Sequence, residues 1–245
     1  MSRARFWVVT AATVVSMAIT ASLGFWQLGR AEQKTALQQA MRDRGAMPVW
    51  TQAELLGAPD PQQGLYRGIR LRGTWEPRHS VFLENRQMDG RVGFFLVTPL
   101  RLTGSDRAVL VQRGWVPRDF NDRLRVPEVP TPAAEVTIEG RLAPPPGRLY
   151  QLGEAGTGPI RQNIDLAAHR LETGLALLDL SVQQTGEPEG LLQRNWPLPA
   201  TDVQKHHGYA FQWFALCALL AGLYGWFQII QPRRLRNRSD GPDAR

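Results

Sequence analysis

The sequence predicts a membrane protein with two transmembrane α-helices flanking a mainly antiparallel β (α+β) extracytoplasmic domain, either a sandwich or a partly open barrel. Residues 6–28 and 208–230 each form a 23-residue run without a charged side chain. As helices they would span about 34 Å, slightly more than a bilayer's hydrocarbon core of roughly 30 Å. The polar, proline-rich segment between them contains at least six short stretches with strand periodicity.

The first apolar run has arginines on both sides. Arg3 and Arg5 precede residues 6–28, and Arg30 follows them. Basic residues in short tails favour the cytoplasmic side of a membrane, so residues 1–5 are predicted to be a cytoplasmic tail. A cleaved signal peptide is the alternative, but the run exceeds a usual signal core of about 7–15 residues.

The second apolar run also has the edges of a membrane helix. Aromatic rings that favour the headgroup zone stand near both of its ends: Tyr209, Trp213, Tyr224 and Trp226. Residues 231–245 form a basic tail with four closely spaced arginines: Arg233, Arg234, Arg236 and Arg238. We therefore predict that both termini are cytoplasmic, that lipid surrounds both runs, and that residues 29–207 lie on the outer side, which for a bacterial inner membrane is the periplasm.

The intervening segment begins with residues typical of a helix. Residues 31–45 are dominated by the helix-favouring types Ala, Gln, Glu, Leu, Met and Arg, hold no proline and end in glycine, which predicts a helical stalk. Residues 45–63 contain three prolines and are predicted to be a loop.

A β-rich domain is predicted over residues 66–185. Its expected strands are 69–75, 80–85, 92–102, 108–116, 136–142 and 176–184. Met88–Asp89–Gly90 predicts a tight hairpin turn, and 69–75 and 136–142 share a pattern that suggests two similar strands, each bent at a glycine. A short helix is expected over 165–172, capped by Asn163 or Asp165 and ended by Gly174. Loops are expected at 118–132, 143–159 and 186–201.

Composition narrows the possible functions. The net charge is +7, but the arginines are scattered, which favours a basic domain beside an anionic membrane and no nucleic-acid partner. The single cysteine, Cys217, excludes a disulfide within the chain and is interpreted as a small packing residue.

The phosphate-loop, dinucleotide, HExxH and CxxC motifs are absent. His79 and His169 are interpreted as solvated surface residues, and the acidic residues as partners in surface ion pairs, so we predict that the protein is not an enzyme.

The one concentrated candidate for chemistry is the pair His206 and His207, at the rim of the second apolar run. A neutral imidazole there can offer a nitrogen to a metal or haem iron. Adjacent helical residues point about 100° apart, so both histidines are not expected to bind one iron. Contact with lipid headgroups is the other interpretation, and the residues alone favour it.

Four stretches resemble the surfeit locus protein 1 family of cytochrome c oxidase assembly factors. They are LGFWQLGRAEQK at 23–34, GRVGFFLVTPL at 90–100, VLVQRGWVP at 109–117 and HHGYAFQWF at 206–214. Their order and spacing, with a span before and after, extend the resemblance over nearly the whole chain. The sequence differs from the family pattern at Gln204 and Lys205 and in 151–195.

The resemblance implies a non-enzymatic chaperone that assists haem-copper oxidase assembly by binding haem a transiently at the outer rim of the membrane. The implied partners are the oxidase catalytic subunit and the haem a synthesis machinery. By position, His206 is the candidate haem iron ligand, and five further residues are candidates for contacts with the haem: His207, Arg30, Lys205, Tyr209 and Trp213. A scaffold without cofactor, which stabilises an assembly intermediate, is the alternative. An unrelated membrane enzyme and a sensor are disfavoured.

Overall fold

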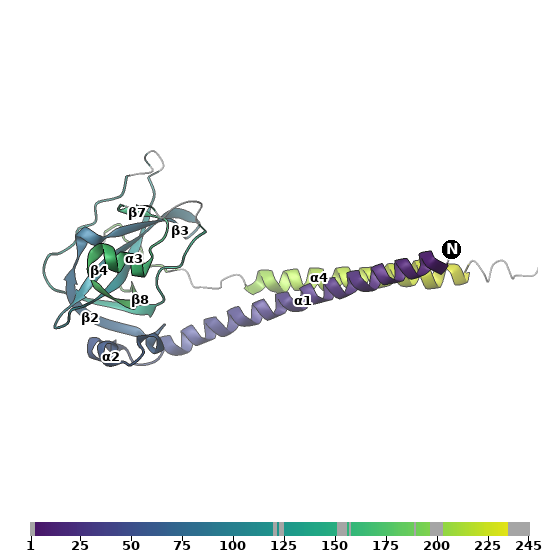
Figure 1. Cartoon of the computed structure of the whole chain (residues 1–245), viewed down its shortest axis with the longest axis horizontal. Helices are drawn as coiled ribbons and strands as arrows, with labels where there is room; N and C mark the ends of the chain where they lie inside the picture. The colour runs from purple at the N-terminus through teal and green to yellow at the C-terminus, as the bar shows by residue number, and fades with distance from the viewer. Residues whose placement is uncertain are drawn as a thin grey trace, which may run out of the picture. The chain divides into compact units, whose positions relative to one another are not determined.

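The computed structural model describes residues 3–119, 122, 125–150, 156, 158–188, 190–196 and 203–234. The chain divides into two compact units. Residues 1–39 and 198–245 form a unit of two long helices, and residues 40–197 form a unit built around a β-sheet (Figure 1).

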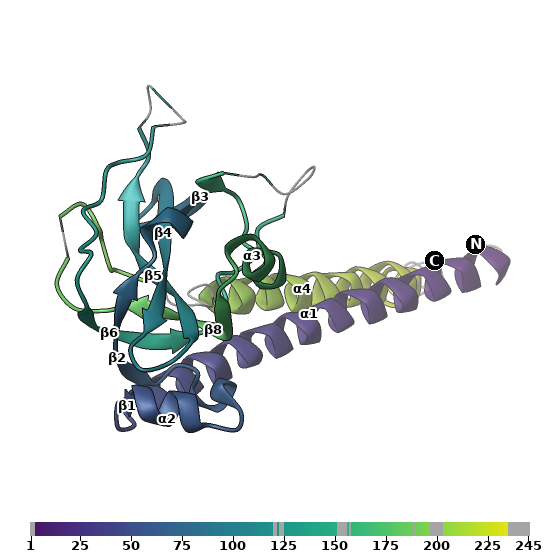
Figure 2. The same ribbon diagram turned by 60° about the vertical axis from the view of Figure 1, so that its left-hand side comes forward.

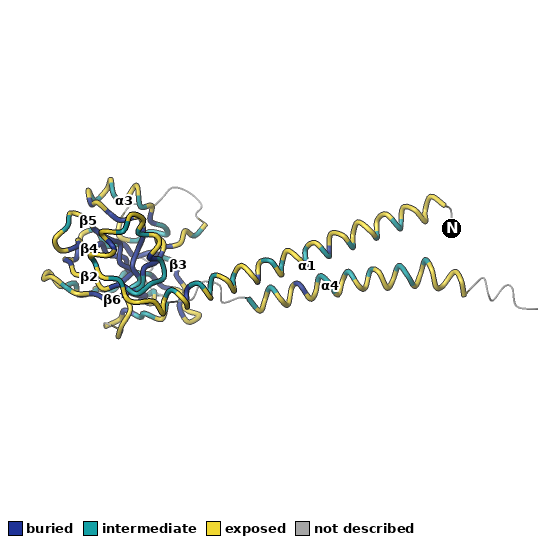
Figure 3. The backbone as a smooth tube through the Cα atoms, turned by 90° about the horizontal axis from the view of Figure 1, so that it is seen from below, coloured by how far each residue is buried: buried dark blue, intermediate teal, exposed yellow. Residues whose placement is uncertain are grey.

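Both apolar runs are helical, as predicted. Helix α1 (Arg3–Gly45) contains the first run and the predicted stalk without a break, and helix α4 (Val203–Tyr224) continues into a π-helical segment, η3 (Gly225–Ile230). By length and composition, both helices are apolar enough to cross a membrane. Large apolar side chains such as Trp7, Val8 and Phe211 are exposed on them. Figure 3 shows that exposed residues, in yellow, predominate along both helices. Such a surface suits an apolar environment better than water.

The six predicted strands are all present in the second unit. They are β2 (Gly68–Trp75), β3 (Val81–Met88), β4 (Arg91–Leu102), β5 (Arg107–Pro117), β6 (Val136–Ala143) and β8 (Ala176–Gln184). β3 is longer than the predicted 80–85 because a bulge at Asn85, with φ of +58°, interrupts the alternation before the strand resumes. Two-residue strands β1 (Trp50–Thr51) and β7 (Ile160–Arg161) add to the edges.

The sheet closes into a five-stranded barrel, so a sandwich and a partly open barrel are both wrong. Neighbours run in the order β2-β6-β8-β5-β4, and β4 pairs again with β2 (Figure 2). The pairs of this ring are antiparallel except the parallel pair β5–β8. Closure occurs at Gly73, which pairs with Val136 of β6 and Leu102 of β4. A Cβ atom there would lie 2.2 Å from the carbonyl oxygen of Arg101, so only glycine allows this approach.

The predicted similarity between 69–75 and 136–142 has a structural counterpart, because β2 and β6 pair with each other. The glycine of β6, Gly140, pairs with Ile69 on one side and Gln184 on the other. A Cβ atom at Gly140 would lie 2.4 Å from Cγ1 of Val182. Both glycines therefore permit close packing inside the barrel.

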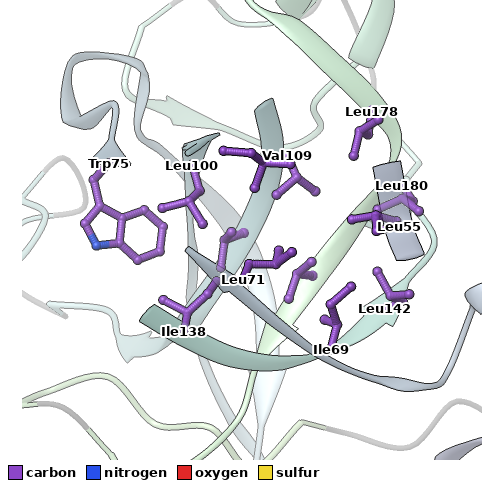
Figure 4. Packing of buried hydrophobic residues seen from close by; sticks show 13 residues of the cluster. Leu55, Ile69, Leu71, Trp75, Leu100, Val109, Ile138, Leu142, Leu178 and Leu180 are labelled. Atoms are coloured by element: carbon purple, nitrogen blue, oxygen red, sulfur yellow. The ribbon is translucent and has the colours of Figure 1, made fainter. Parts of the chain in front are cut away.

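Alternating side chains of the strands fill the barrel with an apolar core. The largest cluster includes Leu71, Leu100, Val109 and Leu180, none of which has exposed surface (Figure 4). Leu55, from helix α2 (Gln52–Gly57), joins the same cluster. The strongest tertiary stabilisation of this unit therefore comes from apolar burial.

The turns and short helices confirm part of the prediction and correct another part. The turn at Asp89 and Gly90 has φ of +49° and +76°, and helix α3 (Leu166–Thr173) is capped by Asp165 and ended by Gly174 at φ of +68°. The predicted loop at 45–63 is wrong in part, because it contains β1, α2 and the 3-10 helix η1 (Pro61–Gly64). A Thr51–Glu54 capping box starts α2, a signal that outweighs the neighbouring prolines.

Three predicted loops fall partly outside the described residues. The described residues of 118–132, 143–159 and 186–201 form no helix. The short strand β7 begins just after the second of these segments, at Ile160. In the third, an isolated β-bridge joins Gln193 to Trp115. Residues 235–245 of the basic tail also lie outside the described part of the chain.

Candidate functional site

Helices α1 and α4 pack side by side in opposite directions, and His206 lies at one end of their contact. At the other end, Thr10 Oγ1 and Tyr224 Oη are 2.8 Å apart. In between, the rings of Phe25 and Phe214 meet edge to face with centroids 5.2 Å apart. The first unit therefore has a defined helix–helix interface, with the early residues of α1 next to the late residues of α4.

Beside Phe25, the α1 side of this interface carries a row of small and polar residues. Its members recur at steps of three, four or seven residues and so share one face of the helix: Thr10, Thr13, Thr20, Gly24 and Gln27. A Cβ atom at Gly24 would lie 2.7 Å from the ring of Phe214, so glycine is what lets this ring approach. Small residues that allow close backbone approach are typical of helix pairs in membranes.

His206 makes a hydrogen bond across the interface to Gln27. Its Nδ1 atom lies 2.7 Å from Oε1 of Gln27. An amide oxygen only accepts hydrogen bonds, so Nδ1 is the donor in this contact, and in a neutral imidazole Nε2 then keeps its lone pair. Histidines that bind metal commonly donate their second ring N–H to an oxygen in this way. The residues present therefore fit a metal or haem iron at Nε2.

The other predicted site residues differ in their placement. Trp213, seven residues after His206, returns to the same face of α4 and is half-buried. His207, Lys205 and Tyr209 are exposed, on neighbouring directions of the helix. His207 points about 100° from His206, as expected for adjacent helical residues.

Arg30 lies one turn beyond Gln27 on α1. Its guanidinium donates a 3.2 Å hydrogen bond to Oε1 of Gln33 and stacks over the ring of Trp26 at 5.7 Å. The side chain is exposed, so these two contacts within its own helix leave it accessible to an anionic group.

Gln27 is the residue that the sequence did not single out as part of the site. It appeared only as one position of the family motif at 23–34, without a role of its own. The available signal was its spacing from Gly24 and Thr20, which places it on the same face as the other small and polar residues of α1. The partner of that face could not be identified, because His206 is 179 positions away.

A cluster of charged residues surrounds His169 on α3, beside the barrel. The prediction that His169 is a solvated surface residue is wrong. His169 is only 2% exposed and its Nδ1 lies 3.4 Å from Oε2 of Glu172, whose carboxylate also accepts hydrogen bonds from the guanidinium of Arg161. Burial lowers the pKa of His169, and the bonds from Arg161 lower the pKa of Glu172 to about 2. His169 was misjudged because α3 turns that face toward the barrel, where Ile164 and Leu166 pack against the core.

This cluster borders a small pocket of about 200 Å³, which half-buried His79 and exposed Arg78 also line. Within the described part of the chain, the structure brings together no group of three or more His, Cys, Asp or Glu side chains that could hold a metal. Other predicted surface ion pairs are present, such as Arg70 with Glu139 at 2.7 Å, both well exposed. We interpret the cluster around Glu172 as structural.

Comparison with known proteins identifies relatives over most of the chain. The sequence model of the SURF1 family matches residues 14–218. A SURF1-like protein from Rickettsia conorii is 26% identical over 223 residues, covering 86% of this chain and 87% of the relative. The Surfeit locus protein 1 of Arabidopsis thaliana is 29% identical over 43% of this chain and 33% of its own length. The Cytochrome oxidase assembly protein SHY1 of Saccharomyces cerevisiae is 28% identical over 38% of this chain and 24% of its own length. The family match includes both Gln27 and His206.

Proposed function

Because this chain belongs to the SURF1 family, we propose that it is an assembly factor for a cytochrome oxidase of the haem-copper type. The proposal draws on the family match and on the yeast relative, whose name states that role. It assigns no catalytic step to the protein.

We further propose that His206 holds haem a before its insertion into the catalytic subunit of the oxidase. The observation that carries this proposal is the 2.7 Å contact between His206 Nδ1 and Gln27 Oε1, which leaves the Nε2 lone pair available. When bound, the haem would supply an iron that accepts this lone pair. Half-buried Trp213 would offer apolar surface to the porphyrin, while Arg30 and Lys205 would pair with its propionates.

The proposed topology follows from the two apolar helices. With α1 and α4 across a bacterial inner membrane and both termini in the cytoplasm, the barrel would be periplasmic and His206 would lie at the outer rim. The partners would be the oxidase catalytic subunit and the machinery that makes haem a. A lipophilic haem could then pass between proteins without leaving the membrane interface.

A different observation favours the alternative, a scaffold without cofactor. The barrel carries a groove of about 690 Å³ beside α2, lined in part by the exposed apolar side chains of Val49 and Leu56. Such a surface could contact an assembly intermediate without any haem.

The absorption spectrum of the protein, purified in detergent after co-expression with the enzymes that make haem a, separates the two functions. We expect a Soret band in the wild type that is lost in His206→Ala. A folded wild-type protein without the band would overturn haem binding and leave the scaffold. Arg30→Glu, in the same preparation, should retain less haem at unchanged protein yield; equal retention would remove Arg30 from the site.

A further inference from the structure

We propose that Gln27 is a positioning residue for His206, and that through it the ligand strength of the imidazole depends on the packing of α1 against α4. The inference rests on the proposed function for the identity of the ligand. The contact itself belongs to the haem-free chain, so it can be tested without haem.

The first step concerns the tautomer. A neutral imidazole exchanges its proton between Nδ1 and Nε2, and only the form with the proton on Nδ1 has a lone pair at Nε2. Gln27 Oε1, at 2.7 Å from Nδ1, stabilises that form and also limits rotation of the ring. Gln27 thus selects the state of His206 that can bind iron.

The second step concerns charge. The amide of Gln27 is a neutral acceptor, so it places no negative charge beside the imidazole of His206. A carboxylate at the same place would withdraw the Nδ1 proton more strongly and make Nε2 a more basic ligand. Gln27→Glu is therefore expected to retain binding while lowering the reduction potential of the bound iron.

The third step concerns the interface. Gln27 and His206 come from different helices, and the close approach of Gly24 to Phe214 lies one turn from Gln27. If the helices separate at this end, His206 loses its acceptor and the tautomer is no longer selected. Retention of the haem is then favoured by the packed helix pair, and its release by separation.

The test uses the full chain in detergent with four variants. Gln27→Leu removes the acceptor, and Gln27→Glu restores one. His206→Ala assigns the imidazole signals, and Gln33→Leu is the matched control, because Gln33 is an exposed glutamine on the same helix that contacts Arg30 instead.

The first readout is the ring nitrogen NMR spectrum of haem-free protein labelled with ¹⁵N-histidine. We expect the Nδ1–H tautomer at His206 in the wild type, Gln33→Leu and Gln27→Glu, and a shift toward the Nε2–H tautomer in Gln27→Leu. An Nε2–H tautomer in the wild type, or an unchanged spectrum in Gln27→Leu, would overturn the inference.

The second readout is haem affinity from a Soret titration. Loss of an outer partner of a ligating histidine typically weakens metal affinity about 10–100-fold, and we expect a loss of this size in Gln27→Leu, with recovery in Gln27→Glu. Equal affinities of Gln27→Leu and the wild type, with binding abolished in His206→Ala, would refute the role of Gln27 alone. If the wild type binds no haem, the proposed function fails and the NMR result still decides whether Gln27 positions His206.

Discussion

The barrel and the helix pair differ in which side chains they bury: large apolar ones in the barrel, small ones between the helices. In the barrel, large apolar side chains such as Leu71 and Leu100 are fully buried. In the described helix segments 3–39 and 203–234, the buried residues are small: Thr20, Gly24, Ala31 and Ala210. Large side chains of the helices, such as Trp7 and Phe211, are exposed instead.

This difference is the one expected if the barrel lies in water and the two apolar helices lie in lipid. Water drives apolar side chains into the core of the barrel, whereas lipid provides no hydrophobic driving force for apolar helices to bury theirs. Helices in lipid associate through close packing of small residues and a few hydrogen bonds. The comparison indicates that the barrel holds most of the stability, while a few contacts between the helices decide how they pair and where His206 lies.

The largest expected effect is a cavity in the barrel. Leu71→Ala should reduce the free energy of unfolding by about 3 kcal/mol, because Leu71 has no exposed surface and its neighbours in the closed barrel cannot fill the space. Urea unfolding of the full chain in detergent, followed by tryptophan fluorescence, measures it.

The matched control is Leu219→Ala on α4, since Leu219 is 56% exposed. It should leave the urea midpoint of the barrel unchanged. Equal losses for the two variants would contradict the contrast between the units.

A smaller effect is expected from overpacking the helix interface. Gly24→Leu should weaken the pairing of α1 and α4 by about 1–3 kcal/mol, because its side chain would overlap the ring of Phe214. Cys217 Sγ lies 3.6 Å from the carbonyl oxygen of Met17, so the oxidative cross-link between Met17→Cys and Cys217 reports the pairing.

Gly29→Leu is the control, because a Cβ atom at Gly29 would meet nothing within 4 Å. The cross-link yield should fall with Gly24→Leu and stay constant with Gly29→Leu. The same fall in both variants would show that the interface does not depend on Gly24.

The smallest expected effect is a dependence of the barrel's free energy of unfolding on pH. Burial holds the pKa of His169 below its ordinary 6.5, so the unfolded chain takes up a proton first as the pH falls below about 6.5. Acidification from pH 7.5 to 5.5 should therefore destabilise the barrel, by at most about 1.4 kcal/mol per pH unit. Glu172, with its pKa lowered to about 2 from 4.5, adds a further loss only below about pH 4.5.

His169→Gln should remove this loss between pH 7.5 and 5.5, which urea midpoints at the two pH values measure. A wild-type barrel that becomes more stable over the same interval would contradict the burial of a neutral His169. The pairing of the helices, followed by the cross-link, should not respond to this variant.

Local patterns of the sequence determined most elements of the fold. The apolar runs, the alternation at 69–75, the Asp89–Gly90 turn and the Asp165 cap each depend on neighbouring residues, so they can be identified without knowing the rest of the chain. The burial of His169 could not be identified in this way. An eight-residue helix shows only a weak apolar pattern, and the surface that covers this face of α3 comes from the sheet.

The sequence by itself also determined that His206 stands at the rim of an apolar helix, and the family resemblance singled it out as a ligand. Only the tertiary structure decided that β2 meets β4 to close the barrel and that Oε1 of Gln27 accepts a hydrogen bond from Nδ1 of His206. The physical reason is the same in both cases. Pairings between distant segments depend on which surfaces the folded chain brings together, and at Gly73 and Gly24 they depend on the absence of a single Cβ atom.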